Sequence, residues 1–153
     1  MTATIFLDWD GVLIPAVELH PPLPDDRKPV FEPRAVKYLN SITIQTGAEI
    51  VVTSSWRMLF SGLEEIAAVM ASRGVKGKVA GMLERTMSAA MTRNRPYEIQ
   101  RYLVSHPEID RFVILDDTPI RAPSLRDHFI KCNPATGLLM RVANRAVRML
   151  QVP

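Results

Sequence analysis

Cysteine is nearly absent from this sequence, in which Cys132 is the single one among 153 residues. A lone cysteine excludes an internal disulfide and any zinc site built from several cysteines. Cys132 lies in an apolar stretch with Phe129 and Ile130. We therefore expect it to be a small buried residue rather than a nucleophile.

Long apolar runs are also missing. No run approaches the roughly 18–20 residues that a helix needs to cross a bilayer. Residues 1–7 enter an apolar run without the basic start or the small-residue cleavage site of a signal peptide. The composition, 47% hydrophobic and 23% charged, indicates neither disorder nor a repeat array. We expect a cytoplasmic protein with no membrane partner.

The excess of positive charge is small. The formal net charge is +3, although the isoelectric point is about 9.3. This balance is compatible with an anionic substrate or with nucleic acid and requires neither. Arg141, Arg145 and Arg148 recur at helical spacing, and we expect them to form a solvated helix face rather than a phosphate-binding stripe.

What the sequence does contain is an alternation of short β-branched runs with amphipathic helical stretches, which is typical of an α/β fold with a parallel sheet. About five strands are expected, at residues 3–7, 48–52, 78–83, 111–115 and 128–131. The expected helices begin at Pro33, after a capping box of Ser61 and Glu64, near Asn94 and after Gly137. Right-handed crossovers then predict a three-layer doubly wound sheet in one domain, residues 1–153.

Three of the strongest apolar runs end in polar clusters: Asp8-Trp9-Asp10, Thr53-Ser54-Ser55 and Asp116-Asp117. Ligands of open α/β sheets bind outside the carboxyl ends of the strands, near the switch point in strand order. If the three strands are neighbours, four carboxylates converge on one crevice, where unpaired burial is costly. A divalent cation that prefers oxygen ligands resolves this repulsion, and Mg²⁺ suits such a site.

Each cluster taken alone has a simpler explanation. Asp10-Gly11 is a common turn pair, and Asp116-Asp117 is suited to cap a following helix. The hydroxyls of Ser54 and Ser55 are suited to bond nearby backbone at the end of a strand. The occurrence of all three clusters, each at the end of an apolar run and in this order, favours a shared site.

These clusters resemble the motifs of the haloacid dehalogenase (HAD) superfamily. Residues 6–13 are similar to the first motif, an apolar strand ending in Asp-x-Asp-Gly. Residues 51–57 are similar to the second, a strand ending in Ser or Thr, and residues 113–117 resemble the fourth in its Asp-Asp form. The third motif is a lone Lys or Arg. Arg95 is our choice for it, with Lys76 and Lys78 as alternatives.

Within the superfamily, two segments are similar to a compact group of HAD domains associated with RNA-repair proteins. One is Ser-Ser-Trp-Arg at residues 54–57, and the other is Asn-Pro-Ala-Thr-Gly-Leu at residues 133–138. The resemblance covers nearly the whole chain. It implies a HAD-like Rossmannoid fold and the chemistry of a phosphatase.

The resemblance implies a displacement in two steps. Asp8 would attack phosphorus to form an aspartyl-phosphate, which water then hydrolyses. Asp10 would protonate the leaving oxygen and later activate the water. Mg²⁺ would be held by Asp8, the backbone carbonyl of Asp10 and Asp116, with Asp117 acting through water.

The remaining positions of the resemblance concern the substrate. Ser54 would bond a phosphoryl oxygen, with Thr53 the alternative if the register differs by one residue. Arg95 would neutralise the phosphate and the charge on Asp8. Trp56 and Arg57 are candidates for contact with substrate, and packing is an equal explanation for Trp56.

The expected function is hydrolysis of phosphate monoesters, including a 3′- or 5′-phosphate at a nucleic-acid end. Residues 12–32 leave room only for a short flap, and the segment between Ser55 and Arg95 is too short for a folded cap. A minimally capped site is open to bulky substrates. The alternatives are a small-molecule or nucleotide phosphatase and a catalytically silent HAD-like binding module. Phosphotransfer to another acceptor would share the first step, and the sequence predicts no oligomeric state.

Overall fold

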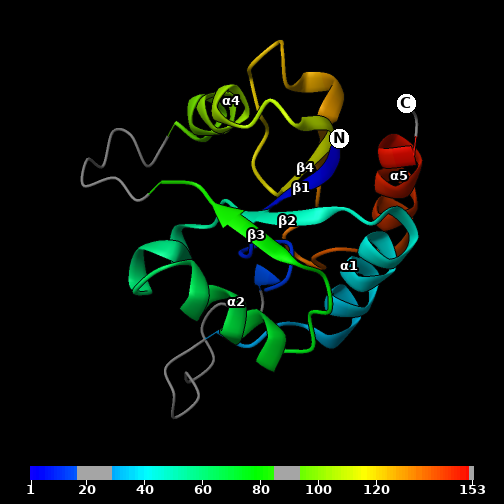
Figure 1. Cartoon of the computed structure of the whole chain (residues 1–153). Coiled ribbons are helices and arrows are strands. Elements are labelled where there is room, and N and C mark those ends of the chain that lie inside the picture. Colours follow the sequence, from blue (N-terminus) through cyan, green and yellow to red (C-terminus); the bar gives the residue numbers. More distant parts are fainter. Residues whose placement is uncertain (17–28, 85–93, 152–153) are drawn as a thin grey trace.

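The computed structural model describes residues 1–16, 29–84 and 94–151. Its centre is a parallel five-stranded sheet with the strand order β3-β2-β1-β4-β5 (Figure 1). The strands are β1 (Thr2–Leu7), β2 (Glu49–Val52), β3 (Val79–Met82), β4 (Ile109–Asp116) and β5 (Phe129–Lys131). The three strands expected to carry the polar clusters, β1, β2 and β4, are neighbours, as the shared site requires.

Helices cover both faces of the sheet, which confirms the three-layer α/β fold. They are α1 (Pro33–Thr46), α2 (Leu63–Ser72), α4 (Arg95–Ser105) and α5 (Met140–Gln151). Buried residues of α1, α2 and α5 form one core cluster with the sheet, and α4 packs on the other face together with Ile120 and Leu125. Figure 1 shows α4 separated from α1 and α5 by the strands.

The boundaries of α1 follow from local chemistry. Pro33 occupies the first turn, where its missing N–H is not needed, and the Glu32 carboxylate accepts from the backbone N–H of Arg34 at 3.3 Å. The helix ends at Gly47, which has a left-handed φ of 69°. The predicted start and end of this helix are confirmed.

The predicted capping box of Ser61 and Glu64 is wrong. Gly62 is the residue that precedes α2, so Ser61 lies one position too early to cap the helix with Glu64. Glu65 reaches it instead, accepting from the Ser61 backbone N–H at 2.9 Å and hydroxyl at 2.6 Å.

The prediction that Cys132 is a buried residue is confirmed. Cys132 is fully buried, and burial raises the pKa of its thiol to about 12, so it stays protonated. Arg141, Arg145 and Arg148 are exposed on α5, which fits both a solvated helix face and a phosphate-binding stripe. Among the described residues, no helix has both the length and the apolar character needed to traverse a bilayer.

The segment Asn133–Leu138 supports the chain that follows the first polar cluster. The Leu138 N–H donates to the Val12 carbonyl at 2.7 Å, and the Ala16 N–H donates to the Pro134 carbonyl at 2.6 Å. Gly137 has a φ of 72°, and a Cβ there would lie 2.7 Å from the Val12 oxygen, so glycine is needed for this approach. The turn thus fixes the loop after β1 from outside the sheet.

Candidate active site

Strand register places three polar residues at one level of the sheet. Leu7 pairs with Val52 on one side and with Leu115 on the other. The Asp8 N–H donates to the Leu115 carbonyl at 3.1 Å, and the Thr53 N–H donates to the Leu7 carbonyl at 2.9 Å. Asp8, Thr53 and Asp116 therefore leave β1, β2 and β4 side by side at the carboxyl edge.

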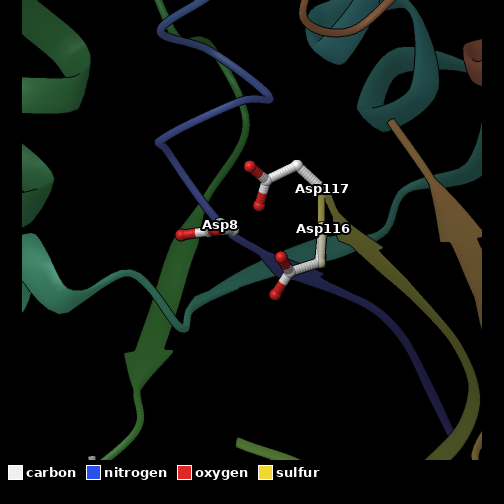
Figure 2. A group of neighbouring side chains, drawn as sticks. All are labelled: Asp8, Asp116 and Asp117. Atoms are coloured by element: carbon white, nitrogen blue, oxygen red, sulfur yellow. The ribbon is translucent and has the colours of Figure 1, made fainter. Parts of the chain in front are cut away.

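Three carboxylates meet at this edge. One oxygen each of Asp8, Asp116 and Asp117 lies within 4.8 Å of the others. Asp8 and Asp116 are buried, whereas Asp117 is half-buried, and Figure 2 shows the three side chains gathered at the ends of β1 and β4. Oxygen donors at this density suit a hard divalent cation such as Mg²⁺.

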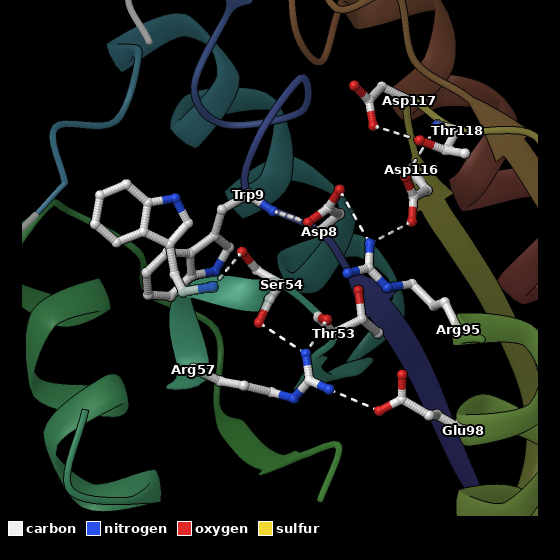
Figure 3. Close-up of polar contacts among 11 residues, drawn as sticks. Asp8, Trp9, Thr53, Ser54, Arg57, Arg95, Glu98, Asp116, Asp117 and Thr118 are labelled. Atoms are coloured by element: carbon white, nitrogen blue, oxygen red, sulfur yellow. Dashed lines mark hydrogen bonds and ion pairs between the residues drawn. The ribbon is translucent and has the colours of Figure 1, made fainter. Parts of the chain in front are cut away.

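Arg95 is the basic residue that the structure brings to these carboxylates. It opens α4, and its Nη1 lies 2.9 Å from Asp116 Oδ2 and 3.3 Å from Asp8 Oδ2 (Figure 3). The alternatives, Lys76 and Lys78, precede β3 and therefore lie at the amino ends of the strands, away from the carboxylates. Lys78 is paired there with Glu49 at 2.8 Å.

The burial of these groups changes their proton affinity. Desolvation raises the pKa of Asp8 to about 8, opposed by the Arg95 charge and reinforced by Asp116. Desolvation also raises the pKa of Asp117. A hydrogen bond with Asp116 and the negative charge of Asp116 raise it further. Burial alone would lower the pKa of Arg95, but the Asp8 and Asp116 carboxylates outweigh it and raise that pKa. A bound cation would relieve the same crowding that favours the proton.

Gly11 allows the loop after β1 to approach the acidic cluster. Its φ is 77°, and a Cβ at this position would lie 2.6 Å from the Asp117 Cβ. Both the left-handed backbone and the close contact require glycine. The Asp-Gly pair is thus a turn, as the simpler explanation held, and it also forms one wall of the site.

Thr53, rather than Ser54, presents a hydroxyl beside Asp8. The Ser54 Oγ accepts from the Trp56 N–H at 3.2 Å and caps the 3₁₀ helix η2 (Ser55–Leu59). Thr53 is fully buried, and its Oγ1 has no hydrogen-bond partner among the described residues. The alternative register left open by the sequence is the one that the geometry favours.

Arg57 is buried and fully bonded. Its Nε donates to the Leu83 carbonyl at 3.1 Å and its Nη1 to the Thr53 and Ser54 carbonyls at 2.7 and 3.0 Å. Its Nη2 donates to Glu98 Oε2 at 2.6 Å and to the Glu84 carbonyl at 3.5 Å. Only 1% of its surface is exposed. This contradicts the expectation that Arg57 contacts substrate, because no N–H group is left to reach it.

Trp56 contacts both a core residue and a candidate catalytic residue. Its indole Nε1 donates to Asp10 Oδ1 at 2.9 Å, and its ring centroid lies 6.4 Å from that of Trp9. Asp10 itself is half-buried and stands apart from the three clustered carboxylates. The structure therefore gives Trp56 a defined contact with the residue expected to be the acid and base.

Comparison with known protein families identifies the family of this chain. Residues 4–143 match the family described as the HAD domain in Swiss Army Knife RNA repair proteins. The chain belongs to this family. The superfamily and the RNA-repair-associated group expected from the motifs are both confirmed. No curated protein and no solved structure matched the chain.

Several features of this HAD domain's site had no sequence signal. The Trp56–Asp10 contact joins residues 46 positions apart, and the Arg57–Glu98 pair joins residues 41 positions apart. Glu98 lies one helical turn beyond Arg95, and nothing in its surroundings distinguishes it from a solvated helix residue. Only the assembled sheet reveals these partners.

Proposed function

We propose that this HAD domain is a Mg²⁺-dependent phosphohydrolase that cleaves phosphate monoesters through an aspartyl-phosphate on Asp8. The observation that carries the proposal is that Asp8, Thr53 and Asp116 lie side by side at the carboxyl ends of three neighbouring strands. Arg95 forms ion pairs with both carboxylates, those of Asp8 and Asp116. Phosphoryl transfer depends mainly on positioning and charge neutralisation. The site supplies a carboxylate nucleophile and a fixed guanidinium at one point.

Two buried donors support an anionic substrate. Three buried side-chain donors have no hydrogen-bond partner among residues 1–16, 29–84 and 94–151, namely the Trp9 indole, the Thr53 hydroxyl and the Arg95 Nε. Buried donors without acceptors are costly, and the last two belong to residues beside Asp8 (Figure 3). A phosphoryl group offers oxygen acceptors to both, so we assign the phosphate-binding role to Thr53 and Arg95.

The covalent steps are as follows. An Asp8 carboxylate oxygen forms a bond to phosphorus as the ester P–O bond breaks, and Asp10 donates its proton to the leaving oxygen. Asp10 then takes a proton from water, whose oxygen attacks phosphorus and releases Asp8 with inorganic phosphate. The indole N–H of Trp56 holds one oxygen of Asp10 throughout.

Asp8, Asp116 and Asp117, with the backbone carbonyl of Asp10, are the groups proposed to hold Mg²⁺. The ion would supply positive charge for the phosphoryl oxygens. We propose a phosphate at a nucleic-acid end as the substrate, supported by the description of the matching family and by the isoelectric point of about 9.3. A small-molecule phosphatase is the alternative.

The substitution Asp8→Asn tests the mechanism. An amide keeps the shape of the side chain but is a far poorer nucleophile, so hydrolysis of 4-nitrophenyl phosphate with Mg²⁺ should fall by about 10³-fold or more. Asp127→Asn, on the exposed surface, is the matched control and should retain activity. A folded Asp8→Asn protein that kept more than about a tenth of wild-type activity would exclude the covalent mechanism.

A further inference from the structure

A cavity of about 430 Å³ opens directly from the acidic site. It lies between the first turn of α4 and the segment that follows β4, and its wall includes Arg95 and Asp116. The volume is in the range of small-molecule sites, about 300–1,000 Å³. Another cavity, of about 240 Å³ between β3 and α4, includes none of the clustered carboxylates. The cavity that shares Arg95 and Asp116 with the acidic site is therefore the candidate place for the part of a substrate that does not react.

The cavity has an apolar wall and a basic end. Pro96, Pro119 and Ile120 line it, and Arg121 completes it. Arg121 is exposed and makes no hydrogen bond or ion pair with any residue that the structure describes. Arg95, by contrast, is already bonded to two carboxylates.

These two arginines differ in what they can offer a ligand. Arg95 is held at the reacting phosphate, while the planar guanidinium of Arg121 is available for a second anion and suits a phosphate in bidentate fashion. Apolar walls between two cationic points suit the base and sugar of a nucleotide residue in a polynucleotide, which has phosphates on the 5′ and 3′ oxygens of its sugar. Arg57, a candidate from the sequence for contact with substrate, is buried and cannot serve.

We infer that this cavity binds the terminal nucleotide of a polynucleotide, with its end phosphate at Asp8 and the next phosphate on Arg121. The inference rests on the proposed phosphatase function and specifies its substrate class. It predicts that the site prefers a nucleoside bisphosphate to a monophosphate, because only the former reaches Arg121.

Arg121→Gln separates this preference from catalysis. The measured quantity is kcat/KM for adenosine 3′,5′-bisphosphate divided by kcat/KM for 4-nitrophenyl phosphate. Loss of one charge-assisted contact at an exposed position should lower this ratio about tenfold, mainly through KM for the bisphosphate. Arg126→Gln, an exposed arginine outside the cavity, is the matched control and should leave the ratio unchanged. An unchanged ratio in Arg121→Gln would overturn the inference.

A binding experiment keeps the inference testable if no hydrolysis is seen. Calorimetric titration of the Asp8→Asn protein in Mg²⁺ should show tighter binding of adenosine 3′,5′-bisphosphate than of adenosine 3′-monophosphate, and adding Arg121→Gln should abolish the difference. Equal affinities for the two ligands would overturn the nucleotide site. Failure of the proposed function would appear separately, as equal activity of the wild-type and Asp8→Asn proteins.

Discussion

The carboxyl group of Asp10 accepts a hydrogen bond from the indole of Trp56. Trp56 Nε1 donates to Asp10 Oδ1 at 2.9 Å, and Trp56 is itself fixed by the 3₁₀ helix that Ser54 caps. This hydrogen bond orients the group proposed to protonate the leaving oxygen. A proton donor matters most when the leaving group is a poor one, so the contact has a measurable consequence for substrate dependence.

Trp56→Phe removes this hydrogen bond while keeping an aromatic ring against Trp9. We expect kcat/KM for an alkyl phosphate to fall about tenfold, in the range for loss of one hydrogen bond to a catalytic group. The loss for 4-nitrophenyl phosphate should be smaller, because 4-nitrophenolate leaves without protonation. Steady-state kinetics with both substrates measure the two factors.

Asp10→Asn provides the reference, since it should show the same ordering of losses with larger factors. Tyr97→Phe, which removes a polar group from a half-exposed aromatic residue, is the control and should affect the two substrates equally. Equal losses for both substrates in Trp56→Phe would show that Trp56 acts through packing alone.

At the scale of elements, Arg57 joins the ends of β2 and β3 to α4. Its guanidinium bonds carbonyls at both strand ends and the carboxylate of Glu98, one turn beyond Arg95. Burial lowers the pKa of Arg57 and raises that of Glu98, and the mutual attraction of the pair opposes both shifts. The junction thus fixes the α4 end that presents Arg95.

Arg57→Met should destabilise the fold strongly. It leaves Glu98 buried without its partner and frees several carbonyls, which together should lower the free energy of unfolding by about 3–5 kcal/mol. Glu98→Gln should cost less, because Arg57 keeps its carbonyl acceptors. Urea denaturation of both proteins measures the difference.

The double variant Arg57→Met/Glu98→Gln serves as the control for charge burial. Removing both charges should recover part of the stability lost in Arg57→Met alone. A double variant as unstable as the sum of the two single changes would show that the ion pair contributes no coupling.

The sequence predicts those site residues that lie at the ends of strands. Apolar runs identified β1, β2 and β4, and the first polar residue after each run is Asp8, Thr53 or Asp116. The pattern predicts Ser54, with Thr53 as the alternative, for the bond to a phosphoryl oxygen, because a sequence does not define the end of a strand to within one residue. The Arg57–Glu98 pair could not be predicted, since it joins two elements through tertiary packing. The expected flap and cap segments fall partly on residues 17–28 and 85–93, outside those described.

At the scale of the whole molecule, the strand order concentrates charge at one edge of the sheet. β1 and β4 are neighbours although 101 residues of the chain lie between Leu7, the last residue of β1, and Ile109, the first residue of β4. Their ends bring Asp8, Asp116 and Asp117 together only in the folded state. Folding is thereby coupled to proton binding at this edge, and it would likewise be coupled to the binding of a divalent cation there.

Without metal, stability should fall as pH rises through the range in which Asp8 titrates. The pKa of Asp8 is about 8 in the folded protein against an ordinary value of 3.8, so between about pH 4 and 8 the folded state holds a proton that the unfolded state has lost. The unfolded state then binds fewer protons, which makes the slope of unfolding free energy against pH negative, at most about 1.4 kcal/mol per pH unit for this group. Urea denaturation in EDTA at pH 5 to 8 measures it, and Asp8→Asn should lack this component.

Mg²⁺ should reverse the trend, because the ion binds the deprotonated carboxylates of the folded state. Its stabilisation should be larger at pH 8 than at pH 5, reaching about 2.7 kcal/mol when free Mg²⁺ is 100 times its dissociation constant. Asp116→Ala should remove most of this gain, whereas Asp127→Asn, on the exposed surface, should keep it. An undiminished Mg²⁺ effect in Asp116→Ala would place the ion elsewhere, and a wild-type slope equal to that of Asp8→Asn would show that Asp8 is ionised throughout. The two results are independent, since the first concerns where the cation binds and the second concerns what the buried carboxyl does in its absence.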